Sequence, residues 1–299
     1  MADLICVQEP KKNLGLIKCD KLPQMIKGMI ETPANWKLTP IQMATESAAK
    51  TAIQAAIKTG VANRVYLWPS FTGFENASTE AAYDETTISN LVADQGKYGF
   101  VFHVSRNMCL HKAMFSHNGQ GSRFILVDKE DNLFLTELSD GSGAGFLAGL
   151  LNVEKLMIGD GSVATKTPIR LILKNHNEIN KRGMMLPASY IDELIPLTDV
   201  DVTIKESPSV STSGFDVEVK TSCDGTPVSG LVTADFAVTT TAGSAQANVV
   251  VAETPAGSGN YRFTKSSGTY EDGFVNLVAA SALTIDAYES TGPATLNVP

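Results

Sequence analysis

The sequence predicts a mainly β protein with two domains: an N-terminal β-sandwich or barrel with one or two packed helices (residues 1–200), then an immunoglobulin-like β-sandwich (residues 201–299). Helical periodicity is confined to residues 40–59 and a shorter stretch at 107–117, while most other apolar residues stand in short alternating runs. Beyond residue 200 these runs recur at the spacing of a sandwich. A chain of 299 residues is long enough for two separate cores.

The composition is that of an ordered protein without a membrane span. Hydrophobic residues make up 43% and charged residues 19% of the chain, and no apolar run approaches the roughly 18–20 residues that cross a bilayer. Glu9, Lys11 and Lys12 interrupt any apolar run that could serve as a secretory signal. We therefore expect synthesis and retention in the cytoplasm.

The net charge of −8 is concentrated in the last third of the chain. Residues 1–200 carry 20 Lys and Arg against 21 Asp and Glu, whereas residues 201–299 carry 4 against 11. Because phosphate binding depends on cationic side chains, the C-terminal domain is unsuited to binding nucleic acid.

The N-terminal domain begins with breaker-rich residues 1–38, which favour short strands or an extended arm. A helix at 40–59 follows, with Thr39 as N-cap, Pro40 at the first helical position, Gln42 closing a capping box and Gly60 as C-cap. Its expected apolar stripe contains Ile41, Ala48, Ala49, Ala52, Ile53, Ala56 and Ile57.

Short strands are expected to complete this domain. They lie at residues 64–70, 97–105, 122–138 (two strands around a turn at 129–132), 153–161 and 167–175, with a second helix at 107–117. Residues 184–199 hold two prolines and no clean period, so the domain boundary is placed near residue 200.

Seven strand-like runs follow, which is the number found in an immunoglobulin-like sandwich. They are residues 201–206, 215–223, 235–241, 247–253, 260–266, 273–280 and 294–299. Tyr270 and Tyr288 are the candidates for a corner tyrosine, and the sequence does not choose between them.

The reactive side chains do not form a recognisable catalytic or metal-binding pattern. His103, Cys109, His111 and His117 match no standard zinc spacing, and Cys109 and His111, two apart on a helix, do not face each other. The four cysteines, including Cys6, Cys19 and Cys223, show no paired spacing, so reduced thiols are expected. We expect no catalytic residue, metal or cofactor, and hence a structural protein rather than an enzyme.

Residues 75–96 form a polar connection that is longer than a compact domain usually contains. A long arm that reaches a neighbouring subunit would explain its length. The candidates for contact with that subunit are Glu80, Tyr83, Asp84 and Glu85.

Two segments resemble the major tail tube proteins of long-tailed bacteriophages. Residues 74–105 look like the long hairpin arm of that family leading into a core strand, and residues 224–238 look like the bacterial Ig-like repeats found on virions. The resemblance implies stacked homo-hexameric rings around a channel through which genomic DNA passes without specific binding. It further implies contacts with other virion proteins, assembly in the host cytoplasm and an exposed Ig-like domain.

Two other interpretations remain open from the sequence. One is a capsid-decorating or head-auxiliary virion protein with a β core and an exposed Ig-like domain. The other is a cytoplasmic enzyme with an accessory sandwich, for which a deep polar pocket containing carboxylates would be expected.

Overall fold

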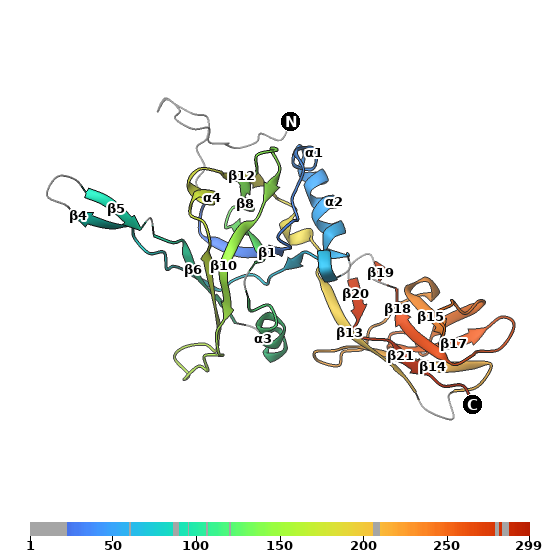
Figure 1. The fold of residues 1–299 in the computed structure, drawn as a ribbon. Helices are drawn as coiled ribbons and strands as arrows, with labels where there is room; N and C mark the ends of the chain where they lie inside the picture. Colours follow the sequence, from blue (N-terminus) through green and yellow to red (C-terminus); the bar gives the residue numbers. More distant parts are fainter. Residues whose placement is uncertain are drawn as a thin grey trace. The chain divides into compact units, whose positions relative to one another are not determined.

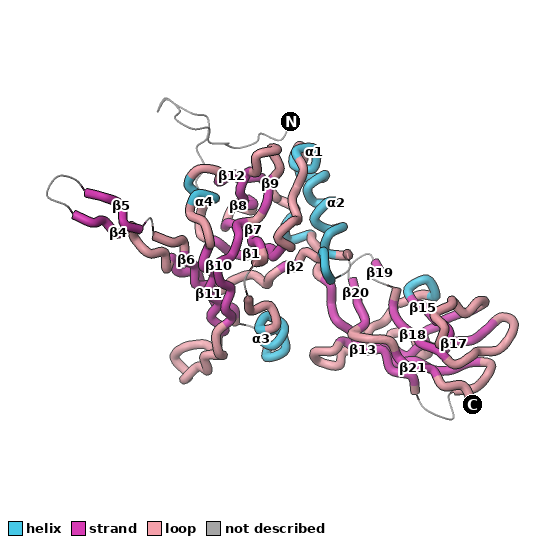
Figure 2. Tube along the Cα trace, viewed as in Figure 1, coloured by secondary structure: helices cyan, strands magenta, loops and turns pink. Residues whose placement is uncertain are grey.

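The computed structural model describes residues 23–59, 61–85, 90–94, 96–105, 107–119, 121–205, 210–278, 281–282 and 287–299. It divides into two compact units, Met1–Leu194 and Ile195–Pro299. Strands dominate both, which confirms the mainly β class (Figures 1 and 2). Residue 200, the boundary expected from the sequence, lies inside the first strand of unit 2, β13 (Leu197–Ile204). Gly60, Cys6 and Cys19 lie outside the described residues.

Unit 1 is built on a 10-stranded sheet whose main path runs β12-β8-β7-β10-β11-β6-β3, with β1 joined to β7 and β2, and β9 to β8. The strands are β1 (Ile26–Thr32), β2 (Tyr66–Leu67), β3 (Gly73–Asn76), β6 (Gly99–Val104), β7 (Arg123–Asp128), β8 (Asn132–Glu137), β9 (Gly143–Ala144), β10 (Phe146–Val153), β11 (Thr167–Leu173) and β12 (Gly183–Pro187). The expected hairpin at 122–138 is confirmed as β7 and β8, and the strand expected at 167–175 is β11.

Strand β10 joins the two halves of this sheet. Its first residues, Phe146 and Leu147, pair with β7, whereas its later residues pair with β11 after a register shift between Ala148 and Leu150. The sheet thereby folds over a shared core that contains Phe100, Phe102, Phe124, Phe134 and Phe146. The prediction of a strand at residues 153–161 is wrong, because β10 ends at Val153 and a loop follows.

A buried carboxylate fixes the pairing of β10 with β7. Glu178, on α4 (Asn177–Asn180), is 4% exposed, and its Oε2 accepts the backbone N–H of Leu147 at 2.7 Å. Its Oε1 accepts from Arg123 Nη1 at 3.2 Å, and the same nitrogen donates to the Gly145 carbonyl at 2.7 Å. The Arg123–Glu178 pair therefore holds the start of β10 beside β7.

The expected helix at 40–59 is two helices, α1 (Pro40–Met43) and α2 (Glu46–Ile57). The capping box of Thr39 and Gln42 is present, but Thr45 forms a second N-cap that restarts the helix. The restart changes the phase of the apolar stripe, so Ile41 is 84% exposed while Ile53 and Ile57 are buried. The expected second helix is confirmed as α3 (Met108–Phe115), with Asn107 as its N-cap.

The expectation of reduced thiols is wrong for the two cysteines that the structure describes. Cys109, on α3, and Cys223 are each disulfide-bonded. Spacing along the chain could not reveal this, because a disulfide depends on distance in the folded protein.

Unit 2 is an immunoglobulin-like sandwich. One sheet runs β16-β17-β14-β13-β20-β19 and the other β15-β18-β21, so the strands that correspond to A, B, E and D share one sheet and those that correspond to C, F and G the other. Besides β13, the strands are β14 (Gly214–Thr221), β15 (Phe236–Thr240), β16 (Val249–Glu253), β17 (Asn260–Lys265), β18 (Gly273–Leu277), β19 (Ser281–Ala282), β20 (Ala287–Ser290) and β21 (Ala294–Leu296). All seven expected strands have a counterpart. The 3₁₀ helices within the described residues are η1 (Val61–Asn63) and η2 (Ile191–Glu193) in unit 1 and η3 (Thr233–Asp235) in unit 2.

Tyr261, which is not one of the two expected candidates, binds two backbone groups of unit 2 through its hydroxyl. Its buried hydroxyl donates to the Val228 carbonyl at 2.7 Å and accepts from the Leu231 N–H at 3.2 Å. The hydroxyl of Tyr270 is also buried, but it has no hydrogen-bond partner among the described residues. Burial raises the pKa of both hydroxyls to about 12, so both remain protonated near neutral pH.

We expect Glu178→Gln to lower the free energy of unfolding of unit 1 by about 3 kcal/mol, because it leaves Arg123 without its buried counter-charge. Denaturant unfolding followed by the fluorescence of Trp36 and Trp68, both in unit 1, measures this loss. The matched control is Glu154→Gln, which removes the more exposed pair with Arg170 and should cost about 0.5 kcal/mol or less. Equal losses of unfolding free energy in the two variants would contradict this role of the Arg123–Glu178 pair.

We expect Tyr261→Phe to destabilise unit 2 by about 2 kcal/mol, because two buried backbone groups lose their partner. Tyr270→Phe, which removes a hydroxyl without a partner, should change the stability by no more than about 0.5 kcal/mol. Native-state hydrogen exchange of β14 and β17 reports both values. A larger loss for Tyr270→Phe than for Tyr261→Phe would refute this assignment.

Candidate functional site

The predicted arm is a two-stranded ribbon that continues the main sheet. β3 pairs with β6, and beyond this pair the Ala77 N–H donates to the Gly99 carbonyl at 2.8 Å and the Thr79 N–H to the Lys97 carbonyl at 3.0 Å. The ribbon then continues as β4 (Ala82–Glu85) and β5 (Asn90–Asp94). Figure 1 shows it extending away from the rest of unit 1.

The segment where the ribbon joins the main sheet, at Gly96 and Gly99, has no room for a larger side chain. We call this segment the neck of the arm. Gly96 has φ +73°, and a Cβ there would lie 2.2 Å from the Thr79 carbonyl oxygen. A Cβ at Gly99 would lie 2.8 Å from the Ala77 carbonyl oxygen. Any larger residue at Gly96 would therefore push apart the two chains that carry the arm.

The outer part of the arm is a separate two-stranded sheet that pairs with no other described strand. Tyr83, Asp84 and Glu85 occupy consecutive positions of β4, opposite Val92, Leu91 and Asn90 of β5. For these three candidates the structure describes the backbone alone. Glu80 precedes β4 and is exposed. Three of the four predicted residues thus share one strand.

The arm carries a single sign of charge. Residues 75–96 include five carboxylates, at Glu75, Glu80, Asp84, Glu85 and Asp94, and no Lys or Arg. A surface that binds the arm would therefore gain from cationic side chains, since opposite charges attract across an interface.

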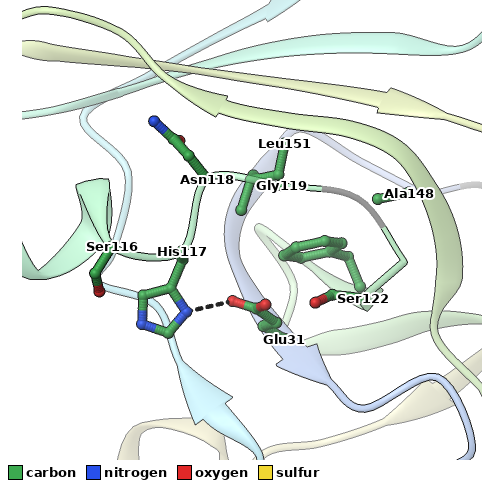
Figure 3. Close-up of a pocket in the computed structure, with 9 residues that line it drawn as sticks. Glu31, Ser116, His117, Asn118, Gly119, Ser122, Ala148 and Leu151 are labelled. Atoms are coloured by element: carbon green, nitrogen blue, oxygen red, sulfur yellow. Dashed lines mark hydrogen bonds and ion pairs between the residues drawn. The ribbon is translucent and has the colours of Figure 1, made fainter.

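A second candidate is a polar pocket of about 260 Å³ in unit 1, lined by Glu31, Ser116, His117, Asn118, Gly119, Ser122, Phe124, Ala148 and Leu151 (Figure 3). The Glu31 side chain is 9% exposed, and its Oε2 lies 2.8 Å from His117 Nδ1. The same oxygen accepts from Trp68 Nε1 at 3.2 Å. Tyr66 and Trp68 both pack edge-on against the His117 ring, at centroid distances of 4.8 and 5.6 Å.

The side chains that line this pocket hold neighbouring elements of unit 1 together, which is a structural role. The Glu31–His117 contact ties the segment after α3 to β1, and Asn118 ties it to β10 by accepting from the Val153 N–H and donating to the Val153 carbonyl. Among the described residues no hydrogen bond joins a serine hydroxyl to His117, and Ser116 Oγ donates instead to the Ala113 carbonyl. The pocket therefore fixes the position of α3 at the end of the sheet. Sequence reasoning missed it, because Glu31 and His117 are 86 positions apart.

The histidine and cysteine cluster seen in the sequence is dispersed in the fold. His103 contacts Glu75 at 3.2 Å, His111 contacts Thr167 at 2.9 Å, and His117 contacts Glu31. Over the ranges that the structure describes, no three His, Cys, Asp or Glu side chains converge as metal ligands would.

Comparisons with known proteins leave the family open. No family model matches the chain, and no curated protein matches it either. None of the helices in the described part of the chain is long and apolar enough to cross a membrane.

We expect Gly96→Ala to open the neck of the arm without unfolding unit 1, because the added Cβ collides with a backbone carbonyl. Hydrogen exchange at the Ala77 and Thr79 amides should accelerate, while the tryptophan-monitored unfolding of unit 1 stays close to that of the parent. Gly161→Ala is the control: Gly161 has φ +95°, but a Cβ there would meet no atom within 4 Å. It carries only the cost of about 1–2 kcal/mol for the left-handed conformation and should leave exchange at the neck unchanged. Unaltered exchange in Gly96→Ala would argue against a glycine-dependent neck.

Proposed function

We propose that the protein is a structural virion protein, the subunit of a phage tail tube built from stacked homo-oligomeric rings. The observation that carries the proposal is the β4–β5 arm. An isolated two-stranded hairpin is marginally stable in water, so an arm that pairs with no other described strand gains stability by packing on another molecule. In a repeating polymer that molecule is another copy of the chain.

The two units have different roles in this proposal. Unit 1 carries the arm and forms the ring, whose channel lets genomic DNA pass without specific binding. Unit 2 lies on the outer surface, where an Ig-like sandwich can contact other virion proteins. The charge distribution supports this division, since residues 201–299 carry 11 carboxylates against 4 cationic side chains and would repel DNA.

Replacing residues 80–96 by Asn-Gly tests the proposal. Thr79 and Lys97 face each other across the ribbon, so a two-residue turn can join them while β3 and β6 remain intact. We expect the purified parent chain to form rings or tubes in negative-stain electron micrographs. The shortened chain should remain folded, by tryptophan fluorescence, but fail to stack.

Two results would overturn the proposal, and a third would remove the observation that supports it. Monodisperse monomers of the parent at high concentration would exclude a tube, and monomers or trimers that bind only to capsid shells would favour a decoration protein instead. Unchanged stacking of the shortened chain would remove the arm from the assembly contact.

A further inference from the structure

Five large apolar side chains are exposed at one end of unit 1. Met108 and Phe115 lie on α3, and Met157, Ile158 and Val163 lie on the loop between β10 and β11, residues 154–166. Hydrogen bonds at their bases hold the two elements close together. Ser105 Oγ, just before α3, donates to the Thr165 carbonyl of the loop, and His111 Nδ1 of α3 lies 2.9 Å from Thr167 Oγ1 at the start of β11. We name this surface, α3 and residues 154–166, the α3 end. Exposed apolar side chains gathered in this way indicate an interaction site.

The loop of the α3 end is ordered by its own hydrogen bonds. Met157 and Lys166 exchange two backbone hydrogen bonds, of 2.9 and 3.0 Å, and the Gly159 N–H donates to Thr165 Oγ1 at 3.0 Å. Asp160 Oδ1 accepts from the N–H groups of Ser162 and Val163. Ile158, which is 83% exposed, is therefore presented on a preformed turn, so binding through it costs little ordering entropy.

The α3 end has cationic side chains without counter-charges. Lys112, Lys155 and Lys166 belong to it, and none of the three has an ion-pair partner within the described ranges. Its two carboxylates are already engaged: Glu154 pairs with Arg170 and Asp160 closes the turn. The arm has the opposite character, with five carboxylates and no Lys or Arg in residues 75–96.

The arm and the α3 end lie at opposite ends of the same strand. β6 leaves the neck of the arm at Gly99, ends at Val104 and leads into α3 (Figure 1). Two complementary surfaces at opposite ends of one molecule produce a head-to-tail contact, which repeats without limit unless it closes into a ring. The charge complementarity thus favours a second copy of the chain as the partner.

We propose that the α3 end is the receptor for the arm of a second copy, with Ile158 at the centre of the contact and the three lysines facing the carboxylates of the arm. This inference rests on the proposed function, because it takes the arm as the assembling element. It adds the surface on which the arm docks.

Ile158→Glu tests the receptor, with Ile41→Glu as the matched control. Ile41 on α1 is 84% exposed, almost the same as Ile158, but lies outside the α3 end. We expect Ile158→Glu to raise the concentration needed for polymerisation by about tenfold or more, as loss of a central contact does. The control should polymerise as the parent does. Equal polymerisation of Ile158→Glu and the parent would overturn the inference.

A mixing experiment separates this inference from the proposed function. The chain with residues 80–96 replaced has a receptor but no arm, and Ile158→Glu has an arm but a damaged receptor. Neither should polymerise alone at the working concentration, whereas an equimolar mixture should form the one remaining contact and sediment as a paired species. If the parent chain does not polymerise, the proposed function fails; if the chain without the arm stacks alone, the arm is not the assembly contact and the inference fails. If the arm is needed but the mixture does not associate, the arm docks elsewhere and only the inference fails.

Discussion

The pairing of β10 with β7 is the joint on which the architecture of unit 1 depends. Only Phe146 and Leu147 form this pairing, yet it connects the half of the sheet that contains β1, β7, β8 and β12 to the half that contains β11, β6 and β3. The buried Arg123–Glu178 pair and the Leu147 N–H bonded to Glu178 reinforce it. Both the arm and the loop of the α3 end extend from strands of the second half, so this joint contributes to their placement, together with the Glu31–His117 contact.

The arm and the loop of the α3 end differ in how they are stabilised. The loop of the α3 end closes on itself through backbone hydrogen bonds and the Asp160 turn, and the segment after α3 is anchored by Glu31 and Asn118. The arm has paired strands but no further strand beside β4 and β5 within the described ranges. In the proposed contact, the arm would gain its missing packing layer by binding to this ordered loop.

The sequence allowed prediction of features that arise locally. Period-2 patterns identified the seven main strands of unit 2, and Thr39 and Gln42 identified the first capping box, since both signals lie within a few residues. Features formed between residues far apart in the sequence could not be predicted. They are the Arg123–Glu178 pair, the Glu31–His117 pocket and the disulfide-bonded state of Cys109. The arm was expected from its length and polarity, but its ribbon form depends on the Gly96 neck, which is recognisable only with Thr79 beside it.

The central claim is that the arm acquires its stability from a second copy of the chain. Hydrogen exchange of the β4 and β5 amides (Ala82–Glu85 and Asn90–Asp94), measured on the parent protein at increasing concentration, tests it most directly. Fast exchange in dilute protein that becomes slow as polymers form is the expected result. Exchange that is equally slow in monomers and polymers, or equally fast in both, would contradict the account.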